Sequence, residues 1–437
     1  MKELTKARAS ASAVGCALIL TTGTGLTNVL NAMIPDLMSG MGNPPMTLFM
    51  LGPSLATICA FLGSLVATQL LEKLTPKWSL LLGSIVVTIM LALFAISDSV
   101  YIWIFANALN GIVLSFGAHA AASAVTAKFW GSRTQSVYGV ISGAYSLLVA
   151  AEVFLVAFLM SIADYRTVLW IFAGLSLFVG VFSNLVLIGR VPKAPLPDAP
   201  AKEGAAKKAE DEDMVKLGVT LKEALKSPSF YFFAIVMFIG AWAMSAVSTF
   251  STIFFTTYGV EESVAASYFG IHTLVGAILM LFAGFITHKF GTRVSGILVF
   301  GFFIVGILSL FVWSTVGGFP LVFAGMALTS TILIVAILPS LFIPELFGMK
   351  HYASINAACM AIYFLGHAVV MVALSGIAEA MGIDNAFLFT AALAGVALVC
   401  VILAYIGRPM KKIMNDAKAP AVPEAEVESL AEAATEI

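Results

Sequence analysis

The chain has 437 residues, of which 60% are apolar and only 11% charged, and its formal net charge is −1. Because a soluble domain carries about 25% charged residues, this composition excludes a water-soluble globular protein and predicts one that crosses a membrane many times. The small net charge gives no basis for binding nucleic acid.

Apolar runs of span length recur along the whole chain. A helix needs about 20 apolar residues to cross the hydrocarbon core of a bilayer. Lys2, Lys6 and Arg8 precede the first run as in a signal peptide, but no clear cleavage site follows, so we expect a retained first helix. About twelve runs qualify, at 12–35, 47–71, 78–97, 101–126, 137–161, 167–189, 230–257, 265–287, 293–315, 320–343, 353–378 and 385–407.

One long polar segment divides these runs into two groups of six. It opens with four prolines between 192 and 200 and continues with dense mixed charge, a composition typical of a solvated, disordered linker. The sequence therefore predicts a six-helix bundle over 1–189, a cytoplasmic linker over 190–229, a second six-helix bundle over 230–408 and a disordered cytoplasmic tail over 409–437.

The basic residues predict the orientation in the membrane. If both termini and the linker are cytoplasmic, all but one of the 23 Lys and Arg residues lie on the cytoplasmic side, the exception being Arg166. The positive-inside rule then favours an even number of spans with both termini inside the cell.

The two halves repeat short patterns at similar positions. An aromatic-Gly-x-basic pattern follows the fourth run at 129–133 and the tenth at 346–350. Loops with basic residues at similar offsets would occur in any such protein, but the shared pattern and near-constant displacement favour a true internal repeat.

The loop after the eighth run carries a family motif. Its sequence, Gly284-x-x-x-His288-Lys289-x-Gly291-x-Arg293, is similar to the G-x-x-x-D-R-x-G-R-R signature of the major facilitator superfamily, with His in place of the acidic residue. A degenerate copy without its glycines spans 68–77 in the first half. The resemblance implies an all-α membrane protein with twelve transmembrane helices in two six-helix repeats.

A second resemblance concerns a subgroup of that superfamily. Phe129-Trp130-x-x-Arg133, Tyr138-Gly139 and the Asp-Tyr-Arg sequence at 164–166 look like the oxalate/formate antiporter and monocarboxylate transporter group. That group implies small organic anions as substrates and intramembrane cationic residues on helices 8 and 11. This chain has His272 and His367 on those runs and no Lys or Arg there.

Four ionisable residues fall inside apolar runs: His119, Glu152, His272 and His367. Ionisable groups within a membrane are costly and are therefore functional candidates. At about 1.5 Å per residue, Glu152, His272 and His367 all lie roughly 24 to 28 Å from the cytoplasmic loops, while His119 is nearer the cytoplasm. The alternative for each His is a structural hydrogen bond to a neighbouring helix.

Polar residues recur at helical spacing on several runs, which predicts one shared aqueous cavity, although Ser and Thr can also simply join helices. We expect Glu152 to be the proton-coupling group. The predicted substrate-binding residues are His272, His367, Tyr145, Tyr363, Asn28, His119 and Trp242. The predicted cytoplasmic gating residues are Glu72, Lys73, Lys289, Arg293, Arg133 and Lys350.

The function predicted from the sequence is secondary active transport of small mono- or dicarboxylates by alternating access, coupled to protons or to a counter-anion. We expect a monomer in the cell (inner) membrane, with no enzymatic activity, cofactor or metal. Two alternatives stay open: proton-coupled efflux of amphipathic compounds, with Glu152 attracting the substrate, and a transporter-like sensor that binds a ligand without moving it.

Overall fold

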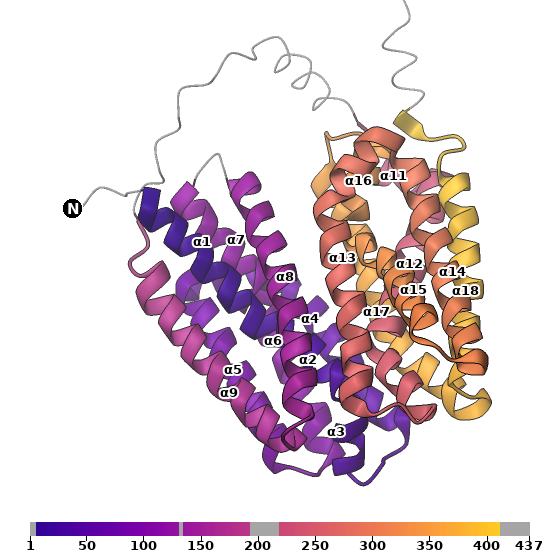
Figure 1. Cartoon of the computed structure of the whole chain (residues 1–437). Coiled ribbons are helices and arrows are strands. Elements are labelled where there is room, and N and C mark those ends of the chain that lie inside the picture. Colours follow the sequence, from indigo (N-terminus) through magenta and orange to yellow (C-terminus); the bar gives the residue numbers. More distant parts are fainter. Residues whose placement is uncertain (1–5, 131–133, 193–217, 411–437) are drawn as a thin grey trace, which may run out of the picture.

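A computed structural model describes residues 6–130, 134–192 and 218–410 of the chain. In these residues every named element is a helix, and twelve helices are long and apolar enough to cross a membrane. The helices form two bundles, one from each half of the sequence, that stand side by side (Figure 1). The predicted all-α fold with twelve spans is therefore confirmed.

The first bundle contains the spans before the linker. Its first span runs from α1 through α2, its fourth through α6 and α7, and its sixth through α9 and η3. Its elements are α1 (Lys6–Leu20), η1 (Thr21–Gly25), α2 (Leu26–Ala32), α3 (Ile34–Gly40), α4 (Met46–Leu74), α5 (Pro76–Ile96), α6 (Val100–Gly117), α7 (His119–Trp130), α8 (Thr134–Met160), α9 (Tyr165–Phe182) and η3 (Ser183–Ile188).

The second bundle follows the linker. A 3₁₀ segment, η4, divides its fourth span, which is the tenth of the chain. Proline stands in the first turn of α12 and α15, where its missing N–H costs nothing. The elements are α11 (Leu221–Ala224), α12 (Pro228–Thr257), α13 (Glu262–Phe290), α14 (Thr292–Val316), α15 (Phe319–Thr329), η4 (Ser330–Ile337), α16 (Leu338–Phe347), α17 (Tyr352–Met381) and α18 (Ile383–Ala404).

A π-helical turn, η1, interrupts the first span at the sequence Thr-Thr-Gly-Thr-Gly. The hydroxyls of Thr21 and Thr24 each donate to the carbonyl four residues earlier, at 2.9 Å. These bonds compete with the backbone ladder, and glycine is a poor helix former, so the helix widens locally. Such π-turns are frequent at functional sites.

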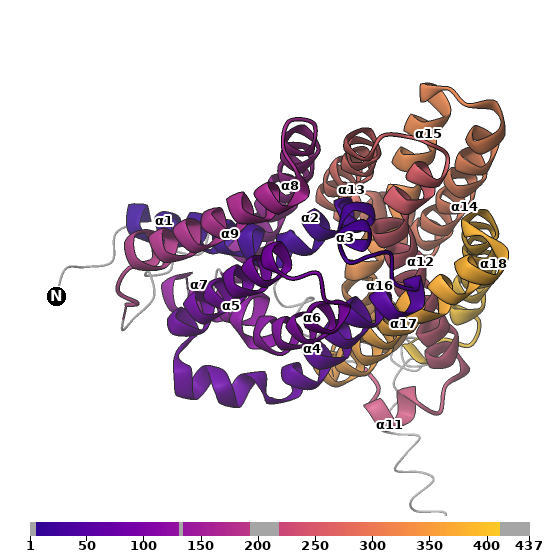
Figure 2. The same ribbon diagram turned by 90° about the horizontal axis from the view of Figure 1, so that it is seen from below.

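The two bundles meet through α8 against α13 and α4 against α17 (Figure 2). The Ser54 hydroxyl donates to the carbonyl of Ala368 at 2.8 Å, and the Thr47 backbone N–H donates to the Glu379 carboxylate at 2.9 Å. The Thr47 contact lies at the start of α4 and near the end of α17, and we call this the far end of the molecule. The Ser54 contact lies further along α4 and at the middle of α17. The ribbons diverge toward the opposite, linker end, where α1 begins and α11 lies (Figure 1).

The last part of the predicted linker is ordered against the second bundle. The backbone N–H of Val219 donates to the carbonyl of Phe347 at 2.9 Å, and Thr220 and Glu223 form a reciprocal capping box on α11. Hydrogen bonds from Thr220 lower the pKa of the Glu223 carboxyl. The predicted disorder of the remaining linker and of the tail concerns 193–217 and 411–437, which lie outside the described residues.

Candidate functional site

A cavity of about 410 Å³ lies between the two bundles. This volume is toward the lower end of the range of ligand pockets, about 300 to 1,000 Å³, and suits a small molecule. The first bundle contributes η1, α2, α3, α4 and α6, and the second contributes α12 and α17. The polar and aromatic lining residues are Thr24, Thr27, Asn28, Asn31, Thr57, Trp103, Asn107, Asn110, Ser245, Ser248, Thr249, Tyr363, Phe364 and His367.

Four asparagines dominate the first bundle's side of the cavity. Asn28 and Asn31 come from α2, and Asn107 and Asn110 come from α6. The Asn107 amide nitrogen donates to the carbonyl of Trp103 at 2.9 Å. The Asn110 side-chain oxygen is buried without a hydrogen-bond partner in the described part of the chain. Because a buried amide oxygen without a partner is costly, it marks a place where a bound molecule could donate a hydrogen bond.

The second bundle presents an aromatic wall with one histidine. The Nδ1 atom of His367 contacts the Ser245 hydroxyl. Its ring meets the Tyr363 ring edge to face, with centroids 4.6 Å apart, and the Tyr363 hydroxyl reaches the Met244 sulfur at 3.4 Å. Of the predicted substrate-binding residues, His367, Tyr363 and Asn28 therefore line the cavity.

The cavity lining is almost free of ionisable groups. Its described residues include no Lys, Arg, Asp or Glu, and Tyr363 and His367 are the only titratable side chains. The charge pattern of the site is thus set by amides, hydroxyls and one imidazole.

Glu152 belongs to a second polar cluster, behind η1 in the first bundle. It is 8% exposed, and its Oε2 atom has no partner among the described residues. A Cβ placed on Gly25 would lie 3.1 Å from this oxygen. One residue earlier, Thr24 lines the cavity and its hydroxyl lies 3.4 Å from that of Tyr145. The turn η1 therefore contacts both the cavity and the buried carboxyl.

His119 and Tyr145 extend this cluster toward the linker end. The two rings meet edge to face with centroids 5.4 Å apart, and His119 Nδ1 lies 2.9 Å from the Tyr138 hydroxyl. His119 is exposed, whereas Glu152 is buried. Tyr138, Tyr145 and Glu152 recur every seven residues on α8 and so share one face.

Two predicted binding residues lie away from the cavity, inside the second bundle. His272 is 1% exposed, and its Nδ1 lies 3.2 Å from the Thr329 hydroxyl. Trp242 donates from its indole N–H to the Thr390 hydroxyl at 3.2 Å. Neither residue lines the cavity that holds His367.

The predicted gating residues are at the ends of helices. Lys73, Lys289, Arg293 and Lys350 are exposed, and the Lys289 ammonium lies 5.5 Å from the Phe290 ring centroid. Glu72 is in the last turn of α4, with its side chain outside the described part. Arg133 also lies outside the described residues.

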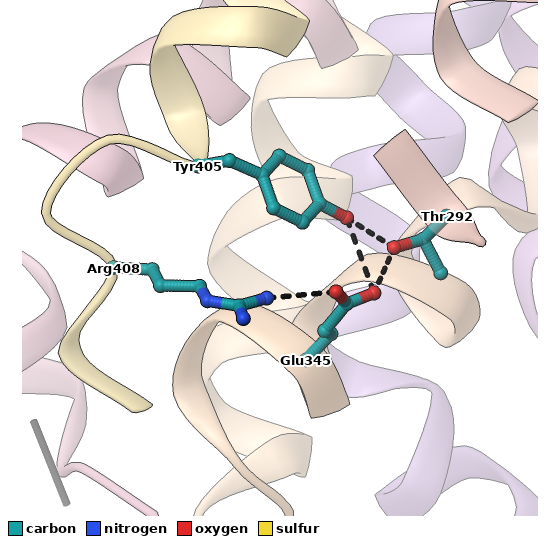
Figure 3. Close-up of polar contacts among 4 residues, drawn as sticks. All are labelled: Thr292, Glu345, Tyr405 and Arg408. Carbon is teal, nitrogen blue, oxygen red and sulfur yellow. Dashed lines mark hydrogen bonds and ion pairs between the residues drawn. The ribbon is translucent and has the colours of Figure 1, made fainter. Parts of the chain in front are cut away.

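Sequence reasoning missed a polar network at the linker end of the second bundle (Figure 3). The Glu345 carboxylate pairs with Arg408 at 2.7 Å and accepts from the Tyr405 hydroxyl at 3.4 Å, while the Thr292 hydroxyl contacts both Glu345 and Tyr405. The network joins the start of α14, the end of α16 and the segment after α18. A signal was available, since Thr292 lies inside the Gly284–Arg293 motif and Glu345 is a lone acid beside an apolar run.

Comparison with known proteins identifies the family. A sequence profile of the Major Facilitator Superfamily matches residues 14–343. This match covers most of the chain, so the protein belongs to the major facilitator superfamily. No curated protein sequence matches the chain.

Solved structures share the whole architecture. A bacterial homologue of the human lysosomal transporter Spinster, in an inward-facing and unoccupied conformation, superposes with a TM-score of 0.71 at 15% identity, covering 95% of this chain and 100% of the other. The nucleoside transporter NupG superposes with a TM-score of 0.67 at 14% identity, covering 91% and 99%. At these identities the likeness is one of fold, and it is the fold of a transporter.

Proposed function

We propose that the protein is a secondary active transporter that moves a small organic solute across a membrane by alternating access. The observation that carries this proposal is a cavity with polar lining residues between two six-helix bundles that meet at one end and diverge at the other. With the termini and linker in the cytoplasm, as the basic residues favour, this conformation faces inward. The protein would act as a monomer in the cell (inner) membrane and not as an enzyme.

Movement between the inward- and outward-facing states requires the far end to open. The hydrogen bonds from Thr47 to Glu379 and from Ser54 to the carbonyl of Ala368 would break as the bundles rock about the cavity. The exposed basic residues at the linker end, including Lys73 and Lys289, would then approach the opposite bundle and act as the inner gate.

We further propose that Glu152 couples transport to protons. A buried carboxyl without a partner is far more stable protonated, because an isolated charge in a low dielectric is costly. The Tyr145 and His119 side chains provide polar groups between Glu152 and the linker end. Since η1 contacts both Glu152 and the cavity, loss of the proton from Glu152 would shift η1 where Thr24 lines the cavity.

Small mono- or dicarboxylates are the substrate class that the subgroup resemblance implies. The feature that favours them is His367, which lines the cavity beside Tyr363 and could offer a positive charge. Efflux of an amphipathic compound is the second candidate. It is favoured by the aromatic wall of Tyr363 and Phe364, although Glu152 lies behind η1 and not in the cavity lining.

The test is solute uptake by the purified full-length protein in proteoliposomes. A panel of labelled carboxylates and uncharged polar solutes would be offered with and without an inward proton gradient, and with unlabelled solute preloaded inside. Saturable uptake of any solute, driven by the gradient or by preloading, is the expected result. Binding of a solute without any uptake or exchange would instead favour the sensor alternative.

A further inference from the structure

The charge content of the cavity bears on the substrate. A carboxylate that leaves water for a confined site needs a cation or several strong donors, because an uncompensated charge is expensive to bury. The described lining residues offer no Lys or Arg, and Nδ1 of the single histidine, His367, is already in contact with the Ser245 hydroxyl. Among the residues that the structure describes, the lining also has no carboxylate that would attract a cation. An uncharged solute would meet no such penalty.

The asparagines define what the solute must carry. Each side-chain amide has an acceptor oxygen and a donor NH₂, so a group of four suits a molecule that both donates and accepts. The Asn110 oxygen has no partner within the described ranges of the chain, and its residue is only 7% exposed. Beside this residue α6 packs closely on α4, since a Cβ on Gly111 would lie 2.1 Å from the carbonyl oxygen of Ala56. Because the oxygen itself is closed off from the cavity, the Asn110 amide has to turn before a solute N–H or O–H satisfies this acceptor.

The second bundle's side of the cavity combines an aromatic pair with the hydroxyls of Ser245, Ser248 and Thr249. Phe364 and Tyr363 line it from α17, and their rings lie 5.9 Å apart in an edge-to-face arrangement. Aromatic faces pack favourably against flat apolar groups, including other rings. The cavity thus offers asparagine amides on the first bundle, and both a stacking surface and hydroxyls on the second.

We infer that the solute is an uncharged organic molecule that carries amide or hydroxyl groups beside a flat apolar face, with Asn110 accepting one of its hydrogen bonds. This inference rests on the proposed transport function for its biological meaning, but the binding it describes can be tested separately. It changes the expectation drawn from the subgroup resemblance, in which the substrate is an anion.

The experiment compares pairs of probes in which an uncharged amide replaces a carboxylate on the same scaffold. Nicotinamide and nicotinate form one pair, and lactamide and lactate form the other. Binding to the detergent-purified full-length protein is measured from the rise in melting temperature with probe concentration. We expect at least one amide to bind at least tenfold more tightly than its carboxylate partner.

Variants at Asn110 test whether the preference for amides arises in the cavity. Asn110→Leu should weaken amide binding about tenfold, the effect of losing one hydrogen bond to a buried group. If this variant does not fold, Asn110→Ala removes the same acceptor oxygen without adding apolar bulk, and it should weaken amide binding similarly. Asn385→Leu, at an exposed asparagine on α18, is the matched control and should bind as the unaltered protein does.

The inference is overturned if neither amide binds more tightly than its carboxylate partner, or if the Asn110 variants retain full affinity for the amide that does. These outcomes are separable from failure of the proposed function. Carboxylate binding with uptake would support the transport function and contradict the uncharged substrate. Amide binding without uptake in proteoliposomes would support the uncharged ligand and contradict the transport function.

Discussion

At the residue scale, Glu152 is the least easily explained side chain in the first bundle. It is buried within a membrane span, and one of its oxygens has no partner in the described part of the protein. A purely structural carboxyl would normally be hydrogen-bonded at both oxygens. Its position behind η1 gives it contact with the cavity wall without direct contact with the cavity.

Replacing the carboxyl by an amide tests its role. Glu152→Gln keeps the shape but cannot release a proton, so proton-driven uptake should fall at least tenfold while exchange of solute for preloaded solute persists. Uptake measured between pH 5.5 and 8 should also lose its pH dependence. Asp98→Asn, at an exposed carboxylate paired with Arg166, is the control. A Gln variant with an unaltered pH profile would remove Glu152 from the coupling mechanism.

Two glycines in the same turn make a matched pair for testing η1. A Cβ on Gly25 would lie 2.7 Å from a methyl carbon of Val149 and 3.1 Å from Glu152, whereas a Cβ on Gly23 would meet nothing within 4 Å. Gly25→Ala should therefore destabilise the protein by about 1 to 3 kcal/mol through overpacking. Gly23→Ala should be close to neutral. Melting temperatures of both variants decide this, and equal values would mean that η1 does not pack closely on α8.

At the element scale, the far end carries a carboxyl pair between the bundles. Asp36 on α3 is hydrogen-bonded to Glu262 at the start of α13, and burial together with that neighbouring carboxyl raises the pKa of Asp36 to about 8. The other charged or titratable groups around it are Glu261, next to Glu262, and Asp164 and Tyr165 at the start of α9. Asp36 would be ionised above about pH 4 if it were exposed.

The direction of the pH effect follows from the difference between the raised pKa of Asp36 and its ordinary value of about 4. The closed far end binds a proton between about pH 4 and 8 that an opened, hydrated Asp36 would release, so low pH favours closure. As pH rises through about 8, the deprotonated pair repels and closure is lost. Cross-linking between cysteines at positions 47 and 379, in a background without the native cysteines, should fall over this range.

Asp36→Asn should remove that pH dependence and keep cross-linking high at pH 8.5, because the amide can still hydrogen-bond to Glu262 without a charge. Asp98→Asn should leave the pH dependence unchanged. If the Asn variant still loses cross-linking between pH 7 and 8.5, a group other than Asp36 controls the far end.

At the scale of the whole molecule, the spans and their division into two halves were predictable because a bilayer demands long apolar helices with few exceptions. The composition and the Gly284–Arg293 motif were sufficient for the family. The direction in which each side chain faces was harder to predict from the sequence. His272 and His367 are at similar predicted depths, yet His272 faces Thr329 within its own bundle and His367 faces the cavity. Depth follows from position in the sequence, whereas the facing direction depends on helix packing.

The asparagines illustrate the same limit. Trp103, Asn107 and Asn110 follow helical spacing of four and three on one run, a stripe visible in the sequence. The ionisable residues were the stronger indication of a functional site, because burying a charge in a membrane costs more than burying an amide. An amide also costs energy to bury, and several of them converging from α2 and α6 became apparent only when the two helices were placed together.

The central claim, alternating access to one cavity, is tested most directly by labelling that cavity from each side of the membrane. Thr27→Cys, in a background without the native cysteines, would be labelled by a membrane-impermeant thiol reagent in inside-out and right-side-out vesicles. We predict rapid labelling from the linker side, slower labelling from the far side, and loss of the far-side labelling alone when positions 47 and 379 are cross-linked. Labelling from the far side that is insensitive to the cross-link, or absence of labelling from the linker side, would contradict the account.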